Sequence, residues 1–333
     1  MSECRFKYEI KQHKKDGHEY AEITGYEGKV AELIVPPSID GKPVEAIGNH
    51  AFSGREDIES IFLPESIRTL YGFAFHNCRN LRKISLFDSL DDYYDGVCRQ
   101  CDSLKDIDIT VNRGWFEVIR NFLADNDRTL RFLIHEKKTG TAIVCDESEN
   151  DASLLMIPDY EEACLTFPEY VYDFNENTMA RTIQFSIAGA GMFYRECVDR
   201  RKIDYRQYDA LFEKAVIDGQ EISESIAIGR ILYPIELSES AKTRYEAHLR
   251  YDSEKVLRRL ISRIEDGKDS VTMLDNLLSY KCNDGDGLFV KEDIESVLKS
   301  TTAKGNTVIS AVLMDKSRDQ QKDDMEGTME FFF

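Results

Sequence analysis

Three short stretches of this 333-residue sequence hold residue types that can do chemistry, and the first is Cys98-Arg99-Gln100-Cys101. A C-x-x-C pair is typical of a redox dithiol or of one half of a zinc site. A zinc site requires two further ligands, and the nearest histidine along the chain is His76. Whether the pair is a redox dithiol or part of a zinc site depends on the secondary-structure elements in which the two cysteines lie.

The second stretch is Gly189-Ala190-Gly191, whose glycines suggest a phosphate-binding loop. A dinucleotide-binding loop requires G-x-G-x-x-G after a strand, and a P-loop requires Gly-Lys-Ser/Thr. Neither pattern is present here. The flanking segments have a helical pattern of apolar residues, so the sequence predicts that the small residues let another helix approach closely.

The third stretch, CNDGDGLFVKED at positions 282–293, is similar to a calcium-binding EF-hand loop, with Asp284, Asp286 and Gly287 at matching positions. The first ligand position holds Cys282 and the last holds Asp293, where the geometry requires a carboxylate and a bidentate Glu. These changes weaken calcium binding severely. The sequence therefore favours a turn between two helices.

The residue sets of the common catalytic sites are missing from the sequence. The six histidines, at positions 13, 18, 50, 76, 135 and 248, form no H-E-x-x-H motif and no paired ligand spacing, and no G-x-S-x-G motif occurs. Carboxylate pairs are abundant because 62 residues are acidic, so they do not indicate acid–base catalysis. We predict a protein that is not an enzyme, with no catalytic, cofactor-binding or metal-binding residues.

The secondary-structure elements that position these stretches can be inferred from a constant period of 23 residues. Ala51-Phe52 recurs as Ala74-Phe75, and Ile61 recurs as Ile84 and then Ile107. The same step relates other positions: Ile58, Leu81 and Leu104; Leu63, Leu86 and Ile109; Val44, Ile67 and Leu90; Cys78 and Cys101. A period of about 20–29 residues indicates a leucine-rich solenoid, in which each coil buries its apolar face against its neighbours.

The repeat register gives the C-x-x-C pair a structural explanation. Cys101 occupies the position of Cys78, and Cys98 occupies the position that Phe52 and Phe75 hold in earlier repeats. Buried packing is therefore favoured over a redox or zinc role. The eight cysteines are too sparse for a disulfide framework, so free thiols are expected.

Three short motifs recur within the repeats: Ile47-Gly48 with Ala51-Phe52, Cys78 with Leu81, and Ile61 with Leu63-Pro64. Over residues 20–111 these motifs resemble the leucine-rich repeats of the BspA bacterial surface-protein type. The resemblance implies a solenoid of parallel coils. The last repeat departs from the pattern, with Tyr93-Tyr94 in place of Ile-Gly, and the ladder is expected to fray there.

The segments beside the repeats predict a cap at each end of the solenoid. FKYEIKQHKKDGHEYAEITGY alternates apolar and polar residues around Lys15-Asp16-Gly17, which predicts a β-hairpin. After the repeats, Gly114-Trp115-Phe116 opens a short helix that runs to about Ala124. The following TLRFLIHEKKTGTAIVC predicts a second hairpin turning at Lys138-Thr139-Gly140.

From about Thr178 the apolar period changes to about 3.6 residues. Helices are predicted near 177–199, 204–218, 221–232, 238–250, 253–265, 269–281, 290–302 and 305–316. The stretch IESVLKSTTAKGNTVISAVLMDKS resembles an ankyrin-like helical hairpin, but it lacks the Thr-Pro-Leu-His signature. That resemblance implies helical-repeat architecture only.

These patterns together predict an α+β fold: a short leucine-rich repeat solenoid with β-hairpin caps, followed by an all-α helical-repeat domain. The predicted divisions are a capping hairpin at 1–25, BspA-type repeats at 26–111, a cap and acidic connecting segment at 112–176, a helical ankyrin-like domain at 177–318, and a flexible tail at 319–333.

Residues that alternate with buried positions on the repeat strands are predicted to face outward. They form two ladders, Ser60, Lys83 and Asp106, and Phe62, Ser85 and Asp108, with Phe87 as a further exposed aromatic residue. Exposed aromatic side chains on a rigid face are typical of binding sites. We predict a non-enzymatic scaffold that binds a protein partner through these seven residues. The alternative is a ligand-binding protein or enzyme with a site in a groove between the solenoid and the helical domain, using Cys98, Cys101 or the Gly189 region.

Charge limits the partners of this chain. Its net charge of −19 disfavours nucleic acid, which requires a basic face, and favours partners with basic surfaces. Between Asp146 and Asn177 there are ten acidic residues and no Lys or Arg, which predicts a solvated acidic loop rather than a calcium site.

Hydropathy and the N-terminal residues bear on location. No stretch approaches the roughly 18 apolar residues of a membrane span, and MSECRFKYEIK has no apolar core of a signal peptide. A cytoplasmic protein is therefore expected. The alternative is an exported or cell-surface protein whose leader has been removed, as is common among BspA-type proteins.

Overall fold

The computed structural model describes residues 5–138, 142–144, 155–157, 159–177 and 182–329, and side chains are discussed for 5–138, 159–172 and 187–318. The chain divides into two compact units, Met1–Asp218 and Gly219–Phe333. Residues 21–136 of the first unit form a β-solenoid of about five turns, and a mostly helical region follows it. The predicted fold class is confirmed.

The first unit begins with the predicted capping hairpin. Strands β1 (Phe6–Gln12) and β2 (Glu19–Tyr26) pair antiparallel, and β2 then pairs in parallel with β5 (Lys42–Ile47). The short strands β7 (Thr69–Leu70) and β9 (Asp92–Tyr93) continue this sheet, while β4 (Ser38–Ile39) pairs with β5 at its side. The hairpin thus covers the first coil, as the alternating pattern predicted.

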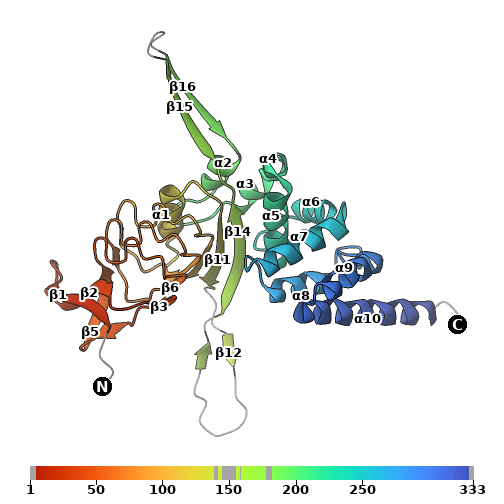
Figure 1. The fold of residues 1–333 in the computed structure, drawn as a ribbon, viewed down its shortest axis with the longest axis horizontal. Coiled ribbons are helices and arrows are strands. Elements are labelled where there is room, and N and C mark those ends of the chain that lie inside the picture. Colours follow the sequence, from red (N-terminus) through yellow and green to blue (C-terminus); the bar gives the residue numbers. More distant parts are fainter. Residues whose placement is uncertain (1–4, 139–141, 145–154, 158, 178–181, 330–333) are drawn as a thin grey trace, which may run out of the picture. The chain divides into compact units, whose positions relative to one another are not determined.

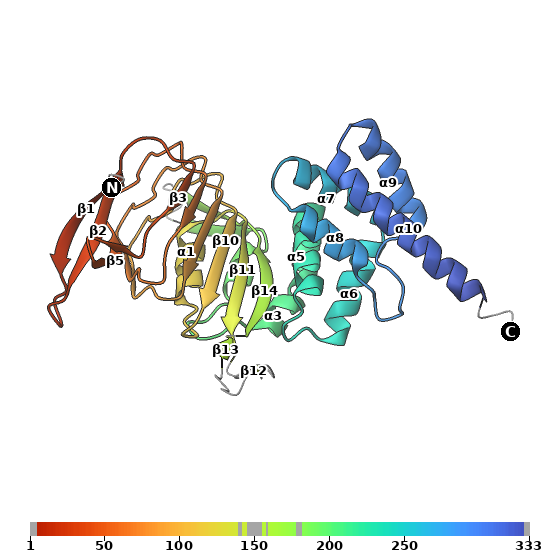
Figure 2. The ribbon, with the colours of Figure 1, turned by 90° about the horizontal axis from the view of Figure 1, so that it is seen from below.

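A second sheet runs along the other side of the coils (Figures 1 and 2). Its order is β14-β11-β10-β8-β6-β3, with β3 (Glu32–Ile34), β6 (Ser60–Phe62), β8 (Lys83–Phe87), β10 (Asp106–Val111), β11 (Leu130–Lys137) and β14 (Tyr160–Phe167). Ile61, Ile84 and Ile107 are direct partners in parallel register, and all three are buried. The 23-residue period therefore corresponds to one coil.

Equivalent side chains from successive coils fill the core of the solenoid. The rings of Phe52 and Phe75 stack with their centroids 5.7 Å apart. The Cys78 thiol donates to the Phe52 carbonyl oxygen at 3.1 Å, and the Cys101 thiol repeats this bond to the Phe75 carbonyl at 3.0 Å. Each coil thus places a thiol and an aromatic ring against the coil before it.

The burial predicted for the C-x-x-C pair is confirmed, because Cys98 and Cys101 are each 1% exposed. A hydrogen bond with Cys78 lowers the pKa of Cys101, but a hydrogen bond with Cys98 and burial outweigh it, so that the pKa is raised overall. Raised thiol pKa values disfavour the reactive thiolate.

Two corners of each coil use left-handed backbone, and they also repeat every 23 residues. One corner holds His50, Phe73 and Gly96, and the other holds Gly54, Asn77 and Gln100, all with φ between 55° and 75°. The His50 and Phe73 rings stack at 5.1 Å. A Cβ on Gly96 would lie 2.5 Å from the Phe73 ring, so glycine is required there both by its φ of 71° and by this contact.

The C-terminal end of the solenoid differs from the prediction. After α1 (Glu117–Asp125), strand β11 pairs in parallel with β10 and so adds another coil. The partner on its other side is β14, antiparallel, and the predicted pairing with the residues directly after 138 is wrong. The predicted turn residues Thr139 and Gly140 lie outside the described residues, and β12 (Ala142–Val144) pairs with β13 (Leu155–Ile157). Leu130, Phe132 and Ile134 alternate into the core, which explains why β11 joins the solenoid sheet.

Strand β14 is the edge of this sheet, and a tyrosine closes part of that edge. The Tyr208 hydroxyl donates to the Thr166 carbonyl oxygen at 2.7 Å and accepts from the Thr166 backbone N–H at 3.0 Å. Tyr208 lies on α3 (Tyr205–Ala210), which is followed by α4 (Phe212–Asp218). The backbone N–H and C=O of Thr166 are therefore both hydrogen-bonded within the chain. Unpaired backbone groups at a sheet edge promote aggregation with other chains.

The predicted helix at 177–199 is wrong for most of its length. Strands β15 (Val171–Asn177) and β16 (Thr182–Ala188) form an antiparallel hairpin, and only the short helix α2 (Gly191–Arg195) follows. A Cβ on Gly191 would lie 2.2 Å from the Pro168 carbonyl oxygen. The small residues at 189–191 therefore admit a loop backbone, not the second helix that the sequence predicted.

The second unit contains helices that agree closely with the predicted ones (Figure 2). They are α5 (Gln220–Leu232), α6 (Glu239–Arg250), α7 (Ser253–Glu265), α8 (Val271–Ser279), α9 (Lys291–Ala303) and α10 (Thr307–Met329). Glycine or Pro234 separates several of them, as the turn signals predicted. Helix α10 runs to Met329, so the backbone is helical over most of the segment predicted to be a flexible tail.

A candidate protein-binding face

The outward face of the second sheet carries rows of side chains in direct register. Ser60, Lys83 and Asp106 are partners in one row, and Phe62, Ser85 and Asp108 are partners in the next. These are the two ladders that the 23-residue period predicted, and Phe87 on β8 lies on the same face. The structure thus brings all seven predicted residues together on one face of one sheet. Their role in binding stays a prediction.

The two aromatic residues of this face differ in exposure. Phe62 is 41% exposed, whereas Phe87, which the sequence predicted to be exposed, is half-buried. Their rings contact each other edge to face, with centroids 6.3 Å apart. Phe62 therefore covers part of Phe87, and together they form one apolar cluster.

A groove of about 480 Å³ lies beside this cluster. Its lining residues, here called the groove residues, are Phe62, Ser85, Leu86, Phe87, Asp108, Thr110, His135, Tyr160 and Glu162. His135, Tyr160 and Glu162 were not predicted for this face, because the sequence predicted a closing hairpin at His135 and a solvated acidic loop at Tyr160 and Glu162. The alternation of Leu130, Phe132 and Ile134 was the available signal, since it matches the repeat strands.

An ionic network crosses the groove. The Lys83 ammonium lies 3.1 Å from the Asp108 carboxylate, and the His135 Nε2 lies 3.0 Å from the same carboxylate. The other ring nitrogen of His135, Nδ1, lies 3.0 Å from Glu162. A histidine between two carboxylates donates to both only when it is protonated, so the network favours the imidazolium ion.

The pKa values of this network follow from these contacts. The hydrogen bond with Asp108 is the main cause that raises the pKa of His135, burial opposes it, and Glu162 adds to the increase. Burial alone would raise the pKa of Asp108, but the hydrogen bonds from His135 and Lys83 outweigh it and lower that pKa.

We expect the stability of the first unit to depend on His135 in a defined direction of pH. Because the pKa of His135 is raised in the folded protein, its protonation stabilises the folded state fully at pH values below its pKa in the unfolded chain, about 6.5. This stabilisation is lost as the pH rises through the pKa of His135 in the folded state. Because the network is half exposed, the change should be at most about 1 kcal/mol. Urea unfolding followed by fluorescence of Trp115, the only tryptophan, should show a larger loss in the wild type than in His135→Gln, in which His18, whose pKa is raised by hydrogen bonds with Asp16 and Glu45, still contributes. An NMR titration giving His135 an ordinary or lowered pKa would contradict the network.

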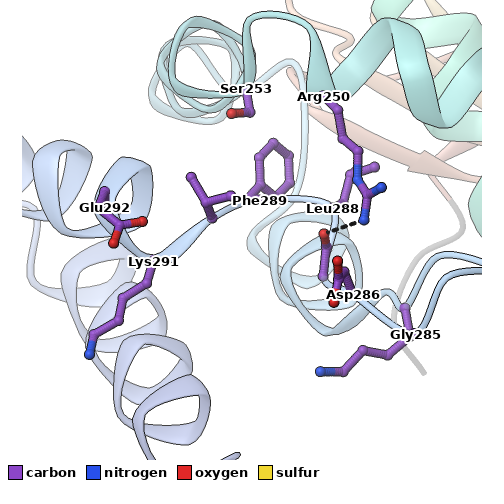
Figure 3. Close-up of a pocket in the computed structure, with 11 residues that line it drawn as sticks. Arg250, Ser253, Gly285, Asp286, Leu288, Phe289, Lys291 and Glu292 are labelled. Atoms are coloured by element: carbon purple, nitrogen blue, oxygen red, sulfur yellow. Dashed lines mark hydrogen bonds between the residues drawn. The ribbon is translucent and has the colours of Figure 1, made fainter. Parts of the chain in front are cut away.

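In the second unit, an arginine side chain binds the EF-hand-like loop. The Arg250 guanidinium binds both carboxylate oxygens of Asp284, at 2.6 and 3.1 Å, and donates to the Gly287 carbonyl at 3.0 Å. Figure 3 shows Arg250 directed at this loop, in a pocket of about 830 Å³ that Phe289 and Lys291 also line. The stretch joins α8 to α9, as predicted, and Arg250 pairs with the Asp284 carboxylate that calcium would need. That the loop binds no calcium stays a prediction.

The two remaining candidate stretches pack against the protein's own backbone. Among the described residues, neither Cys98 nor Cys101 belongs to a group of three possible metal ligands. The glycines at 189 and 191 lie against the backbone of Pro168 and Glu169. The alternative function that rested on these residues has gained no support from their geometry.

Comparison with known proteins identifies the class to which the repeats belong. Residues 33–133 match the BspA type leucine rich repeat region, in six copies. The match extends past the predicted end of the repeats at 111 and includes the first half of β11, in agreement with the structure. This segment of the chain therefore consists of BspA-type leucine-rich repeats.

Solved structures of bacterial leucine-rich repeat proteins are similar to parts of the chain. A leucine rich cell surface protein from Faecalibacterium prausnitzii is 20% identical over 32% of this chain and 35% of its own, with a TM-score of 0.27. A leucine-rich repeat protein from Bacteroides capillosus is 24% identical over 31% of this chain and 77% of its own, with a TM-score of 0.27. The leucine-rich repeat protein of T. pallidum is 21% identical over 31% and 68%, with a TM-score of 0.22.

The matched segment spans about a third of the F. prausnitzii protein. No curated protein matches the chain. The ankyrin-like resemblance of the C-terminal helices has no support among these comparisons. Within the described residues, no helix has both the length and the apolar character needed to cross a membrane.

Proposed function

We propose that this protein is a non-enzymatic interaction scaffold that binds a protein partner through the outward face of the second sheet of the first unit. The observation that carries the proposal is the exposed Phe62 beside the groove, on strands fixed by a continuous buried core. Side chains on such strands lose little conformational freedom on binding, so less free energy is spent on ordering them.

The chemistry of the groove favours one kind of partner. Phe62 and Phe87 supply an apolar wall, while Asp108 and Glu162 supply carboxylates. The chain as a whole carries a net charge of −19, which attracts basic surfaces over distance. A partner segment with an apolar side chain beside a lysine or arginine fits both features.

The proposal is tested by affinity capture from the source organism with a matched pair of variants. Phe62→Ala combined with Ser85→Arg removes the exposed ring and places a cation in the groove. Ile10→Ala removes an exposed apolar side chain of the capping hairpin and serves as the control. The double variant should weaken binding of the main partner at least about tenfold, or about 1.4 kcal/mol. The control should bind like the wild type.

Retention of the same partners by the double variant would show that binding uses another surface. Equal loss from both variants would show that the effect does not come from the groove. Urea unfolding of each variant checks that the solenoid stays folded.

A further inference from the structure

The tip of the capping hairpin brings together three side chains with metal-ligating atoms. His13 follows β1, His18 precedes β2, and Asp16 lies in the turn between them. The Asp16 carboxylate oxygen Oδ1 lies 3.0 Å from His13 Nδ1 and 2.7 Å from His18 Nδ1. The three atoms lie within 4.8 Å of one another. The hairpin therefore creates the paired histidine ligands that linear spacing did not indicate.

A fourth residue, from a different part of the chain, orients one of these histidines. His18 Nε2 lies 2.8 Å from the carboxylate of Glu45, on β5. Metal-binding histidines usually donate their second ring N–H to a carboxylate, which fixes the tautomer and leaves the first nitrogen for the ion. Glu45 is the carboxylate that contacts the second ring nitrogen of His18, Nε2. The Nδ1 atom of His18 is directed toward Asp16 and His13.

We propose that His13 Nδ1, His18 Nδ1 and Asp16 Oδ1 bind a divalent transition-metal ion of the zinc type, with Glu45 as the residue that positions His18. Two imidazoles and one carboxylate suit zinc, copper and nickel better than calcium or magnesium. Small side-chain rotations bring the three atoms within about 2.1 Å of one ion, the usual length of zinc bonds to histidine.

The site is open to solvent, because the side chains of His13 and His18 are each 40% exposed and that of Asp16 is 62% exposed. An ion can therefore enter without any opening of the fold, and a fourth position stays free for water or for a partner's side chain. When the ion binds, both rings ligate as neutral imidazoles: His18 releases its Nδ1 proton to solvent and keeps the Nε2–H bonded to Glu45, and His13 adopts the tautomer with its proton on Nε2. The bound ion links the capping hairpin to β5 through this bond.

Zinc titration calorimetry on the full chain, without a histidine tag, tests the proposal. We expect one zinc ion per chain with a dissociation constant in the micromolar range. The double variant Asp16→Asn with His18→Gln should abolish this binding. Glu45→Gln should weaken it by about tenfold, since loss of a supporting carboxylate usually costs a factor of 10–100 in metal affinity.

The control is His50→Asn, which removes an exposed imidazole of the solenoid at a corner with φ of 55° that asparagine tolerates. Its zinc affinity should equal that of the wild type. Binding that persists unchanged in the double variant would place the zinc elsewhere and overturn the proposal, as would the lack of any stoichiometric binding by the wild type. Far-UV circular dichroism confirms that each variant is folded.

Discussion

Replacing Phe75 with alanine is expected to destabilise the first unit by about 3–5 kcal/mol, the usual cost of deleting a buried aromatic side chain. Phe75 is fully buried and stacks on Phe52 of the coil before it. Its removal leaves a cavity between coils that cannot close, because the strands on both sides are held in register. Urea unfolding followed by Trp115 fluorescence measures the loss, since this tryptophan lies in the first unit.

Phe62→Ala is the matched control for that measurement. It makes the same chemical change in the same solenoid, but its ring is 41% exposed and contacts the ring of Phe87 edge to face. Its cost should stay below about 1 kcal/mol. Equal destabilisation by the two variants would contradict the division of this unit into a buried core and a free outward face.

The second large effect is expected in the helical unit. The side chain of Glu224 is 2% exposed and bonds to two guanidinium groups, Arg259 at 2.8 Å and Arg263 at 3.3 Å. Arg263 is itself buried and keeps one other carboxylate, Asp269, at 2.7 Å. Glu224→Leu should destabilise this unit by about 3–5 kcal/mol, because it leaves buried positive charge with too few partners.

Thermal unfolding followed by circular dichroism at the helical wavelength measures this effect. Glu254→Gln is the control, because Glu254 pairs with Arg258 one turn away on α7 and both side chains are about 40% exposed. An exposed pair of this kind contributes little to stability, because solvent screens it. A loss from Glu224→Leu no larger than that of the control would show that the buried network is not needed.

The parts of the fold that repeat were predictable from the sequence. A constant period fixes which residues become neighbours, and the alternation on each strand then fixes which face they share. For this reason Ser60, Lys83 and Asp106 were placed in one row before the strands themselves were known. The helices of the second unit were also predictable, since glycine and proline separate amphipathic segments of ordinary length.

The parts of the fold that were not predicted are those in which the 23-residue period changes. Between β10 and β11 the step from Asp106 to its partner Arg131 is 25 residues, because α1 is inserted. Strand β14 then enters antiparallel from a distant part of the chain, bringing Glu162 opposite His135. Three of the nine groove residues, His135, Tyr160 and Glu162, therefore depend on contacts that no local pattern encodes.

A different cause explains the wrong helix near residue 183. Ile183, Phe185 and Ile187 alternate as a strand does, but the glycines and the apolar residues after them also fit a helical period. Only pairing with β15 decides between the two. The histidine pair at 13 and 18 was predictable in principle, since the expected hairpin turn at Lys15-Asp16-Gly17 is what brings the two rings together.

Photo-crosslinking from the groove tests the central claim of a binding face most directly. A benzoylphenylalanine residue is introduced at Ser85, in the middle of the groove, and separately at Ile10 on the capping hairpin. The account predicts that, after irradiation in cells, the Ser85 position captures a discrete protein that the Ile10 position does not, and that Phe62→Ala reduces this capture. Capture of the same proteins from both positions, or capture from Ser85 unaffected by Phe62→Ala, would contradict it.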